Sequence, residues 1–222
     1  MSEIEAIYAH RFSEEERLRK EQLWQVLCRH FFQRYVQPHD VVLDLGAGFC
    51  EFINNIECRT RYAVDLSDET ARFARADVVV YRTPATDLSP LADDSLDLVF
   101  CSNFFEHLRD KGAMCRTLDE IRRVLKPGGR LMILQPNIKY LVAEYWDLFD
   151  HHIPISHLSM VEALAGHAFT PLVVIPRFMP FTTKSALPQS QLLVRAYLKF
   201  PPAWRILGRQ MFVLAEKRER AT

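Results

Sequence analysis

A short segment with two glycines is the first place where this chain could bind a reactive group. Residues 41–45 are apolar except for Asp44, which predicts a buried strand, and Gly46 and Gly48 follow it. Glycines at the end of a strand permit a sharp turn and let a ligand approach the backbone. A dinucleotide site would need a third glycine where this chain has Glu51. The two carboxylates therefore favour a cationic ligand over a pyrophosphate.

An acidic residue ends the second expected strand, residues 61–65. Asp65 lies about 20 residues after the glycine turn, where a carboxylate can accept hydrogen bonds from both hydroxyls of a ribose. The alternative is that Asp65 caps the helix that follows. Because Ser67 or Asp68 can supply that cap, we expect Asp65 to hold a ribose.

Histidines follow the fourth and fifth expected strands, at the edge where open α/β sheets bind ligands. His107 can act as a general base near neutral pH, or it can bond a backbone carbonyl or line the cofactor. A second group, His151, His152 and His157, lies in a segment dense in aromatic and ionisable residues, which is typical of a pocket wall.

A metal centre made of this second group is not expected. Side chains of the adjacent His151 and His152 point apart on most backbones, and no pattern of supporting residues is visible. A base role for one of these histidines and a plain capped turn before a helix that begins at Ser156 remain open alternatives.

The hydrophobic patterns predict alternating strands and helices, which is typical of an α/β sheet protein. Ser13 and Glu16 form a capping box for the first helix, whose apolar stripe (Trp24, Leu27, Phe31, Tyr35) is expected to cover the sheet. Expected strands are 41–45, 61–65, 77–81, 97–102, 130–136, 169–175 and 210–217; expected helices are 13–36, 49–56, 114–125, 156–166 and 189–200.

Four landmarks in order over residues 41–135 resemble class I S-adenosylmethionine-dependent methyltransferases. They are Asp44-x-Gly46-x-Gly48, Asp65, the pair of segments 93–99 (D-D-S-L-D-L-V) and 106–108 (E-H-L), and 125–131 (L-K-P-G-G-R-L). Cys50 stands where the family's first motif has its last glycine. The resemblance implies a Rossmann-like, doubly wound, seven-stranded and mostly parallel sheet with an antiparallel last strand.

The resemblance also implies the cofactor and its site. S-adenosyl-L-methionine would lie on the glycine turn, with the loop after the third strand near its adenine ring, although a plain turn is an equal alternative for that loop. Tyr8 or His10 could belong to a lid. The expected cofactor-binding residues are Asp44, Gly46, Ala47, Gly48, Asp65, Leu66, Thr86, Asp87 and Asn103, the catalytic candidates are His107, His151 and His152, and no metal is expected.

Length and composition indicate one domain, residues 1–222. Within it we expect an N-terminal helix (13–36), a cofactor-binding core (41–135) and a substrate-facing part (137–222) with an insert at 176–209. The chain is 49% hydrophobic and 25% charged, lacks an apolar run of membrane-spanning length, begins with an acidic segment and has no C-x-x-C pair. These features predict a cytoplasmic protein with reduced cysteines.

Charge is unevenly distributed along the chain. Residues 1–162 hold 19 Lys and Arg against 26 Asp and Glu, whereas residues 163–222 hold 9 against 2. The basic and aromatic insert could contact an anionic membrane surface at its periphery, hold a lipid-linked acceptor, close as a lid or form a homodimer. Nucleic acid is not expected, because no dense basic cluster or RNA-binding module is present.

The function expected from these features is methyl transfer to an oxygen, or a nitrogen, of a sugar, a lipid-linked glycan or a small metabolite such as a quinone. Asn103 lacks the following P-P-[YF] that marks amide and adenine N-methylation. The alternatives are a regulatory or scaffold protein that binds S-adenosylmethionine without turnover, and a nicotinamide oxidoreductase.

Overall fold

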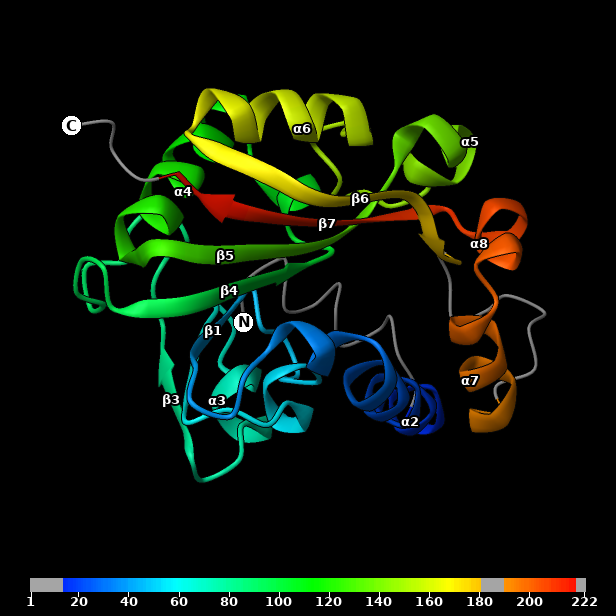
Figure 1. Ribbon diagram of the computed structural model, residues 1–222, viewed down its shortest axis with the longest axis horizontal. Coiled ribbons are helices and arrows are strands. Elements are labelled where there is room, and N and C mark those ends of the chain that lie inside the picture. The colour runs from blue at the N-terminus through cyan, green and yellow to red at the C-terminus, as the bar shows by residue number, and fades with distance from the viewer. Residues whose placement is uncertain (1–13, 181–189, 219–222) are drawn as a thin grey trace.

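The computed structural model describes residues 14–180 and 190–218. Its seven strands form one sheet in the order β3-β2-β1-β4-β5-β7-β6 (Figure 1). Neighbours from β3 to β5 pair in parallel, and β7 pairs antiparallel with both β5 and β6. The predicted sheet is confirmed. The strands are β1 Val41–Leu45, β2 Thr60–Val64, β3 Val78–Tyr81, β4 Leu96–Ser102, β5 Leu125–Pro136, β6 Phe169–Met179 and β7 Gln210–Lys217.

Helices cover both faces of the sheet. In Figure 1, α4 and α6 lie above the strands, while α2, α3 and α7 lie below them. The helices are α2 Glu14–His30, α3 Glu69–Phe73, α4 Lys111–Val124, α5 Val142–Tyr145, α6 His157–Gly166, α7 Gln191–Lys199 and α8 Pro201–Leu207. The described residues also form the 3-10 turns η1 Phe32–Tyr35, η2 Ile53–Asn55, η3 Phe105–His107 and η4 Ile138–Tyr140. Both faces are therefore shielded from water, as a parallel sheet requires.

The apolar stripe predicted for the first helix packs on the sheet as expected. The Phe31 ring stacks on Phe178 at 4.1 Å between centroids and meets the edge of Phe212 at 4.9 Å. Trp24 packs against Phe100 of β4. Fully burying aromatic rings of this size contributes about 1.5–3 kcal/mol each, so this contact fixes the helix on the sheet.

The first helix is shorter than predicted. It ends at His30, and the separate turn η1 carries the remaining part of the stripe, with Tyr35 stacked on Phe212. The expected Ser13 cap, Tyr8 and His10 lie outside the described residues.

The prediction of a helix at residues 49–56 is wrong. The chain there forms turns and η2 only. Gly48 and Cys50 have φ of +51° and +60°, which no right-handed helix accommodates. The side chain of Asp44 instead accepts a hydrogen bond from the Ile53 amide at 3.3 Å. The positive φ angles and the bond to Asp44 thus determine the conformation of this segment, and its helix propensity does not.

The insert at 176–209 also differs from the prediction. β6 continues to Met179, and Pro201 and Pro202 begin α8 besides ending α7. Proline suits the first turn of a helix, where its missing amide would have no partner. Trp204 donates to the Tyr197 carbonyl at 2.7 Å, and Tyr197 donates to the Phe178 carbonyl at 2.6 Å. These bonds attach both helices to β6.

Among the described residues, no helix has the length and hydrophobicity needed to cross a membrane.

Replacing Gly208 by alanine should destabilise the fold. A Cβ at this position would lie 2.6 Å from backbone atoms of Arg177 and Trp204, which cannot move independently of β6 and α8. We expect a loss of about 1–3 kcal/mol in the free energy of unfolding, measured by urea denaturation. Gly166→Ala is the matched control, because its Cβ would meet no atom within 4 Å and alanine favours the helix by about 0.5–1 kcal/mol. Equal stability of the two variants would contradict the packing described here.

Candidate functional site

The turn after β1 is held by the end of β2. Gly46 and Ala47 both donate their amides to the Val64 carbonyl, at 2.8 and 3.2 Å. Gly46 has φ of +72°, and a Cβ there would overlap the Phe104 ring. A Cβ on Gly48 would meet no atom within 4 Å. A glycine is therefore needed at position 46, because of both its backbone angle and the adjacent Phe104 ring. Gly48 instead borders open space where a ligand can approach the main chain.

Cys50 does not fill that space. Its side chain is fully buried, and its thiol donates to the Thr70 carbonyl at 3.6 Å. Its φ of +60° lies in the left-handed region, where glycine is the ordinary choice. The turn keeps the conformation of a glycine-rich loop, because Thr70 also donates its hydroxyl to the Gly48 carbonyl at 2.8 Å.

Asp65 lies directly beneath this turn. One carboxylate oxygen accepts the Gly48 amide at 2.8 Å, and the other accepts the Ser67 amide at 2.9 Å. Each oxygen retains a further lone pair, so the carboxylate can still accept hydrogen bonds from two hydroxyls. The N-cap of α3 is Asp68, so Asp65 does not cap that helix. Leu66 beside it is 58% exposed and open to a ligand.

Three carboxyl groups lie at or near the turn. Burial raises the pKa of Asp44 well above its usual value, and the nearby carboxylates of Glu51 and Asp65 raise it further, against the Ile53 hydrogen bond. Glu51 is partly neutralised by Lys20 at 2.8 Å. The raised pKa favours the neutral form of Asp44, so attraction of a cation to this turn depends on the carboxylates of Glu51 and Asp65.

The remaining residues predicted to bind the cofactor differ in how available they are to a ligand. Asn103 has φ of +45° and a buried Oδ1 that accepts no hydrogen bond from the described residues, so a ligand could supply the donor. Thr86 is half-buried in a turn, while Asp87 is exposed and accepts the Ser89 amide at 3.0 Å. Hydrogen bonds from Ser89 lower the pKa of Asp87. Asp87 thus organises its own turn, and contact of this loop with an adenine stays a prediction.

A buried cluster of ionisable side chains follows β4. In η3, Glu106 is 1% exposed, and its Oε2 accepts the Gln135 amide at 2.6 Å. The Nδ1 of His107 lies 3.0 Å from the Asp150 carbonyl and 3.2 Å from the Asp150 carboxylate. Burial lowers the pKa of His107, but the hydrogen bonds that its ring donates to Asp150 and the charges of Glu106 and Asp150 outweigh this effect and raise the pKa.

His151 completes this cluster. Its ring packs edge-on against Tyr145 at 4.6 Å and against His107 at 5.1 Å between centroids. The backbone amide of His151 bonds to the Leu148 carbonyl at 3.2 Å, in the turn after α5. The structure therefore brings together two of the three histidines that were candidates for catalysis.

The other histidines lie elsewhere. The His152 side chain is exposed, and this residue contributes its backbone amide to the Glu106 carbonyl at 2.7 Å. His157 stacks on Tyr140 and bonds to Asn137 at 3.0 Å. The sequence interpretation missed Glu106 and Asp150, although each is next to a candidate histidine in the sequence.

Phe104 joins the cluster to the glycine turn. Its ring lies against Gly46, and its carbonyl accepts the His107 amide at 3.1 Å. The glycine turn and the ionisable cluster are thus neighbours at the carboxyl edge of the sheet, as expected for a ligand site in an open α/β fold.

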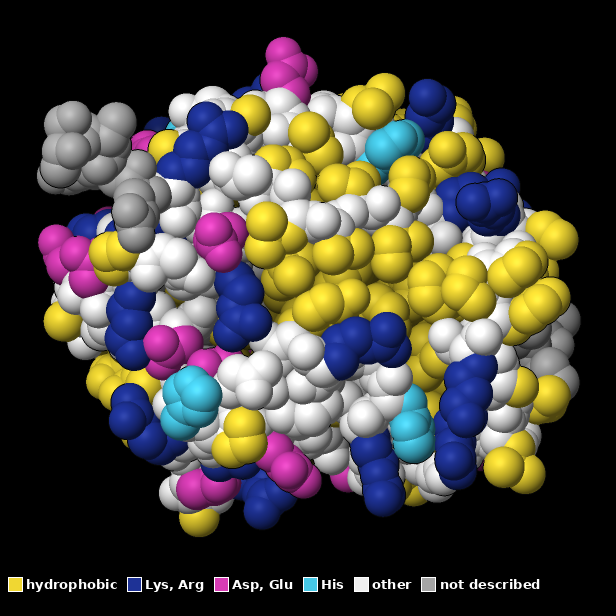
Figure 2. Space-filling view, in the orientation of Figure 1, with side chains coloured by type: hydrophobic (Ala, Val, Ile, Leu, Met, Phe, Trp, Pro, Cys, Tyr) yellow, Lys and Arg dark blue, Asp and Glu magenta, His cyan; other side chains and the backbone are white. Residues whose placement is uncertain are grey.

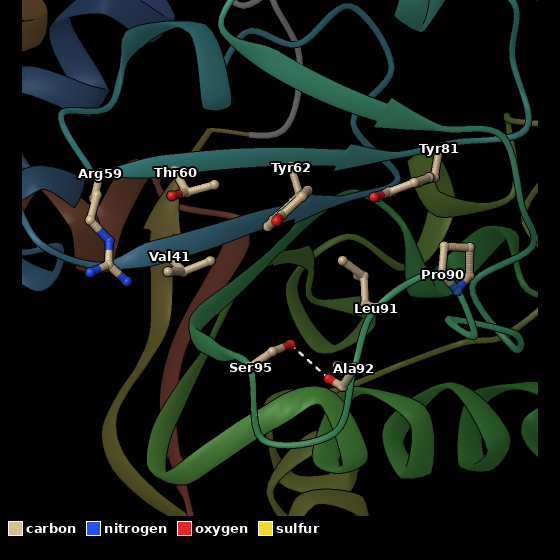
Figure 3. A pocket seen from close by; sticks show the side chains of 9 residues that line it. All are labelled: Val41, Arg59, Thr60, Tyr62, Tyr81, Pro90, Leu91, Ala92 and Ser95. Atoms are coloured by element: carbon tan, nitrogen blue, oxygen red, sulfur yellow. Dashed lines mark hydrogen bonds between the residues drawn. The ribbon is translucent and has the colours of Figure 1, made fainter.

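A cavity of about 420 Å³ lies at the opposite end of the strands (Figure 3). It is lined by Val41 and Thr60, which begin β1 and β2, and by Ser95, which precedes β4. Tyr62 and Tyr81 stack along one side at 6.0 Å between ring centroids. None of the candidate site residues lines this cavity.

Comparison with known proteins agrees with this geometry. A family model described as a methyltransferase domain matches residues 43–133. Over these residues, which are less than half of the chain, the sequence is similar to a methyltransferase domain. The family and the fold imply S-adenosylmethionine as the cofactor, which supplies an electrophilic methyl group when bound.

Relatives and solved structures share this domain. The chain is 30% identical over 159 residues to a demethylmenaquinone methyltransferase of Symbiobacterium thermophilum, covering 63% of this chain and 61% of that one. It is 32% identical over 119 residues to an uncharacterised protein of Methanocaldococcus jannaschii, covering 52% and 50%. The chain therefore spans half to three fifths of these relatives.

The fold itself is shared more widely. A methyltransferase in complex with the Trm112 methyltransferase activator of Haloferax volcanii is 18% identical, with a TM-score of 0.73 and 99% of both chains covered. A SAM-dependent methyltransferase from Archaeoglobus fulgidus is 20% identical, with a TM-score of 0.66, covering 89% of this chain and 94% of that one.

Asp65→Ala should weaken cofactor binding strongly. Loss of charge-assisted hydrogen bonds to ribose removes about 1.5–3 kcal/mol, which corresponds to a roughly 10- to 100-fold higher Kd for S-adenosylhomocysteine in calorimetric titration. Asp68→Ala is the matched control, since this exposed carboxylate pairs with Arg82 at the surface. If the two variants bound the ligand equally, Asp65 would not be a ribose ligand.

Proposed function

We propose that this chain transfers the methyl group of S-adenosylmethionine to an oxygen of a small-molecule or lipid-linked acceptor. The observation that supports this most directly is the buried cluster of Glu106, His107 and His151, joined to the glycine turn through Phe104. Nitrogen is the second choice of acceptor atom. A domain with this fold that only bound the cofactor would have no need for buried ionisable groups at this edge.

Each part of the site has a separate task in this proposal. The glycine turn and Asp65 hold the cofactor, and the surrounding carboxylates stabilise its positive sulfur before transfer. The cluster holds the acceptor and activates its hydroxyl. The burial of Glu106 and His151, 1% and 6% exposed, keeps bulk water from competing with the acceptor.

Exposed apolar side chains beside the cluster indicate the class of acceptor. Val142, Trp146 and Phe149 are 64%, 54% and 88% exposed and lie in α5 and the turn that leads to Asp150. They suit an acceptor whose reacting oxygen is attached to an apolar body. A lipid-linked glycan meets this description, and so does a quinone. The quinone is favoured by the resemblance to an enzyme named demethylmenaquinone methyltransferase.

A lipid surface is the proposed location of such an acceptor. In Figure 2, hydrophobic side chains extend across the face that contains β6 and β7 towards α8, with Lys and Arg around them. Leu192, Phe200 and Ile206 in the α7–α8 region are also exposed, and Arg195 and Lys199 are basic residues of the same segment. Arg177 and Arg209 bond within the protein, to the Gly208 carbonyl and to Glu144, so the basic surface is smaller than the sequence indicated.

The deciding experiment is transfer of radiolabelled methyl from S-adenosylmethionine into an extract of the source cells, separated into lipid, glycan, RNA and small-molecule fractions. Label in the lipid or glycan fraction is expected. Label in RNA alone would overturn the acceptor class, and cofactor binding without transfer would favour a regulatory protein. Because the Haloferax neighbour is named as the partner of an activator, the extract should supply proteins as well as acceptors.

His107→Gln should lower kcat for this transfer by about 100-fold or more, because activation of an acceptor by a positioned side chain typically contributes 10²–10⁴-fold. The Kd for S-adenosylhomocysteine should stay within about twofold, since the cluster faces the acceptor. His39→Gln is the control, as this side chain is 79% exposed and precedes the amino end of β1, whereas the cluster follows the carboxyl end of β4. An unchanged kcat in the His107 variant would remove the cluster from the reaction.

A further inference from the structure

Three side chains near the acceptor site converge as metal ligands do. Glu106, His107 and His151 each offer one ligand atom, and the three atoms lie within 4.8 Å of one another. Zinc binds imidazole nitrogen and carboxylate oxygen at roughly 2.0–2.2 Å, so an ion between them would draw the ligands inward by less than about 1 Å. Two imidazoles and one carboxylate are a known donor set for catalytic metal sites that keep a position open.

The neighbours of His107 fix its ring in the orientation that a ligand needs. Nδ1 faces two oxygens of Asp150, the carbonyl at 3.0 Å and the carboxylate at 3.2 Å, so Nδ1 carries the proton. In the neutral ring the lone pair is then on Nε2, which faces Oε1 of Glu106 at 3.9 Å. This arrangement, with a carboxylate behind a histidine whose other nitrogen is a ligand, is common at metal sites.

The carboxylate of Glu106 is arranged in a similar way. Gln135 occupies Oε2 with a hydrogen bond of 2.6 Å, which leaves Oε1 directed towards His107. The separation of 3.9 Å is too long for a hydrogen bond. A side chain that is 1% exposed gains little from water, so the ionised form of Glu106 needs a compensating positive charge. A divalent cation between Oε1 and Nε2 provides it.

His151 is held in place independently of the other two ligands. It comes from the turn after α5, where Tyr145 packs on its ring and Tyr145 itself donates to the Ile153 carbonyl. Asp150 is the residue before it, so one turn supplies both a ligand and the group that orients His107. The site is therefore built from two segments that are each anchored, as a rigid metal site requires.

We propose that Glu106, His107 and His151 bind a divalent transition-metal ion of the zinc type, with an open position for the acceptor oxygen. The proposal rests on the proposed function for its role in transfer, but not for binding of the ion. In the reaction the acceptor O–H gives its proton to solvent under the influence of the cation. The oxygen then forms a bond to the methyl carbon, and the carbon–sulfur bond breaks with both electrons on sulfur.

This proposal revises the expectation that no metal is bound. The expectation considered His151, His152 and His157, of which only His151 reaches the cluster. The other ligands come from the segment after β4, about 45 residues earlier in the chain.

The first test measures Zn²⁺ binding to the full-length, chelator-treated protein by calorimetry, without cofactor or acceptor. One strong site per chain is expected. Glu106→Gln and His151→Gln should each weaken it by at least about tenfold, and Asp150→Asn by about 10- to 100-fold through loss of orientation. His39→Gln should leave it unchanged. A wild-type affinity no higher than that of the Glu106→Gln, His151→Gln double variant would overturn the proposal.

A second measurement does not depend on variants that could fold poorly. Co²⁺ added to the wild-type chain should produce visible absorption of the strength typical of four- or five-coordinate sites with nitrogen and oxygen ligands, displaced by Zn²⁺. Weak bands typical of hexaaqua Co²⁺ would contradict the site. Metal binding without affinity for S-adenosylhomocysteine would refute the proposed function alone. Methyl transfer that persists undiminished in the chelator-treated protein would refute the role of the metal in transfer.

Discussion

The candidate site depends on how the turn after β1 is attached to the end of β2. The Val64 carbonyl accepts both the Gly46 and the Ala47 amide, and Asp65, the next residue, accepts the Gly48 amide. Three hydrogen bonds from adjacent residues thus set the conformation of the turn that borders the cofactor space. Positive φ angles at Gly46, Gly48 and Cys50 are the cost of this geometry. The same carboxylate that shapes the turn remains able to bind the ligand.

Buried carboxylates at the carboxyl edge have a common physical consequence. Asp44 and Glu106 are 3% and 1% exposed, and burial raises the pKa of each carboxyl. Among the described residues, neither carboxyl group forms an ion pair with an Arg or a Lys. A fold selected for stability alone would replace such groups with apolar side chains. Both lie near the carboxyl edge, where open α/β sheets bind ligands.

The sequence correctly predicted the strands and helices that follow from a regular hydrophobic pattern. It failed where unusual backbone angles determine the local structure. The bounds predicted for β1 and β7 are those observed, and α6 was predicted together with its N-cap, Ser156. These elements follow from hydrophobic periodicity and capping, which are local properties. The absent helix at 49–56 could not be foreseen, because the left-handed φ of Cys50 reflects contacts with Thr70, 20 residues away.

The site was predictable only as far as motifs extend. Asp65 and the glycines stand where the first and second motifs place them, whereas no motif relates residues 106–107 to residues 150–151. The amides of His152 and Ile153 both donate to the Glu106 carbonyl, so the backbone itself brings these segments together. Side-chain chemistry at the acceptor edge is therefore a product of tertiary pairing. It can vary between relatives while the cofactor motifs stay fixed, which is how one fold can serve many acceptors.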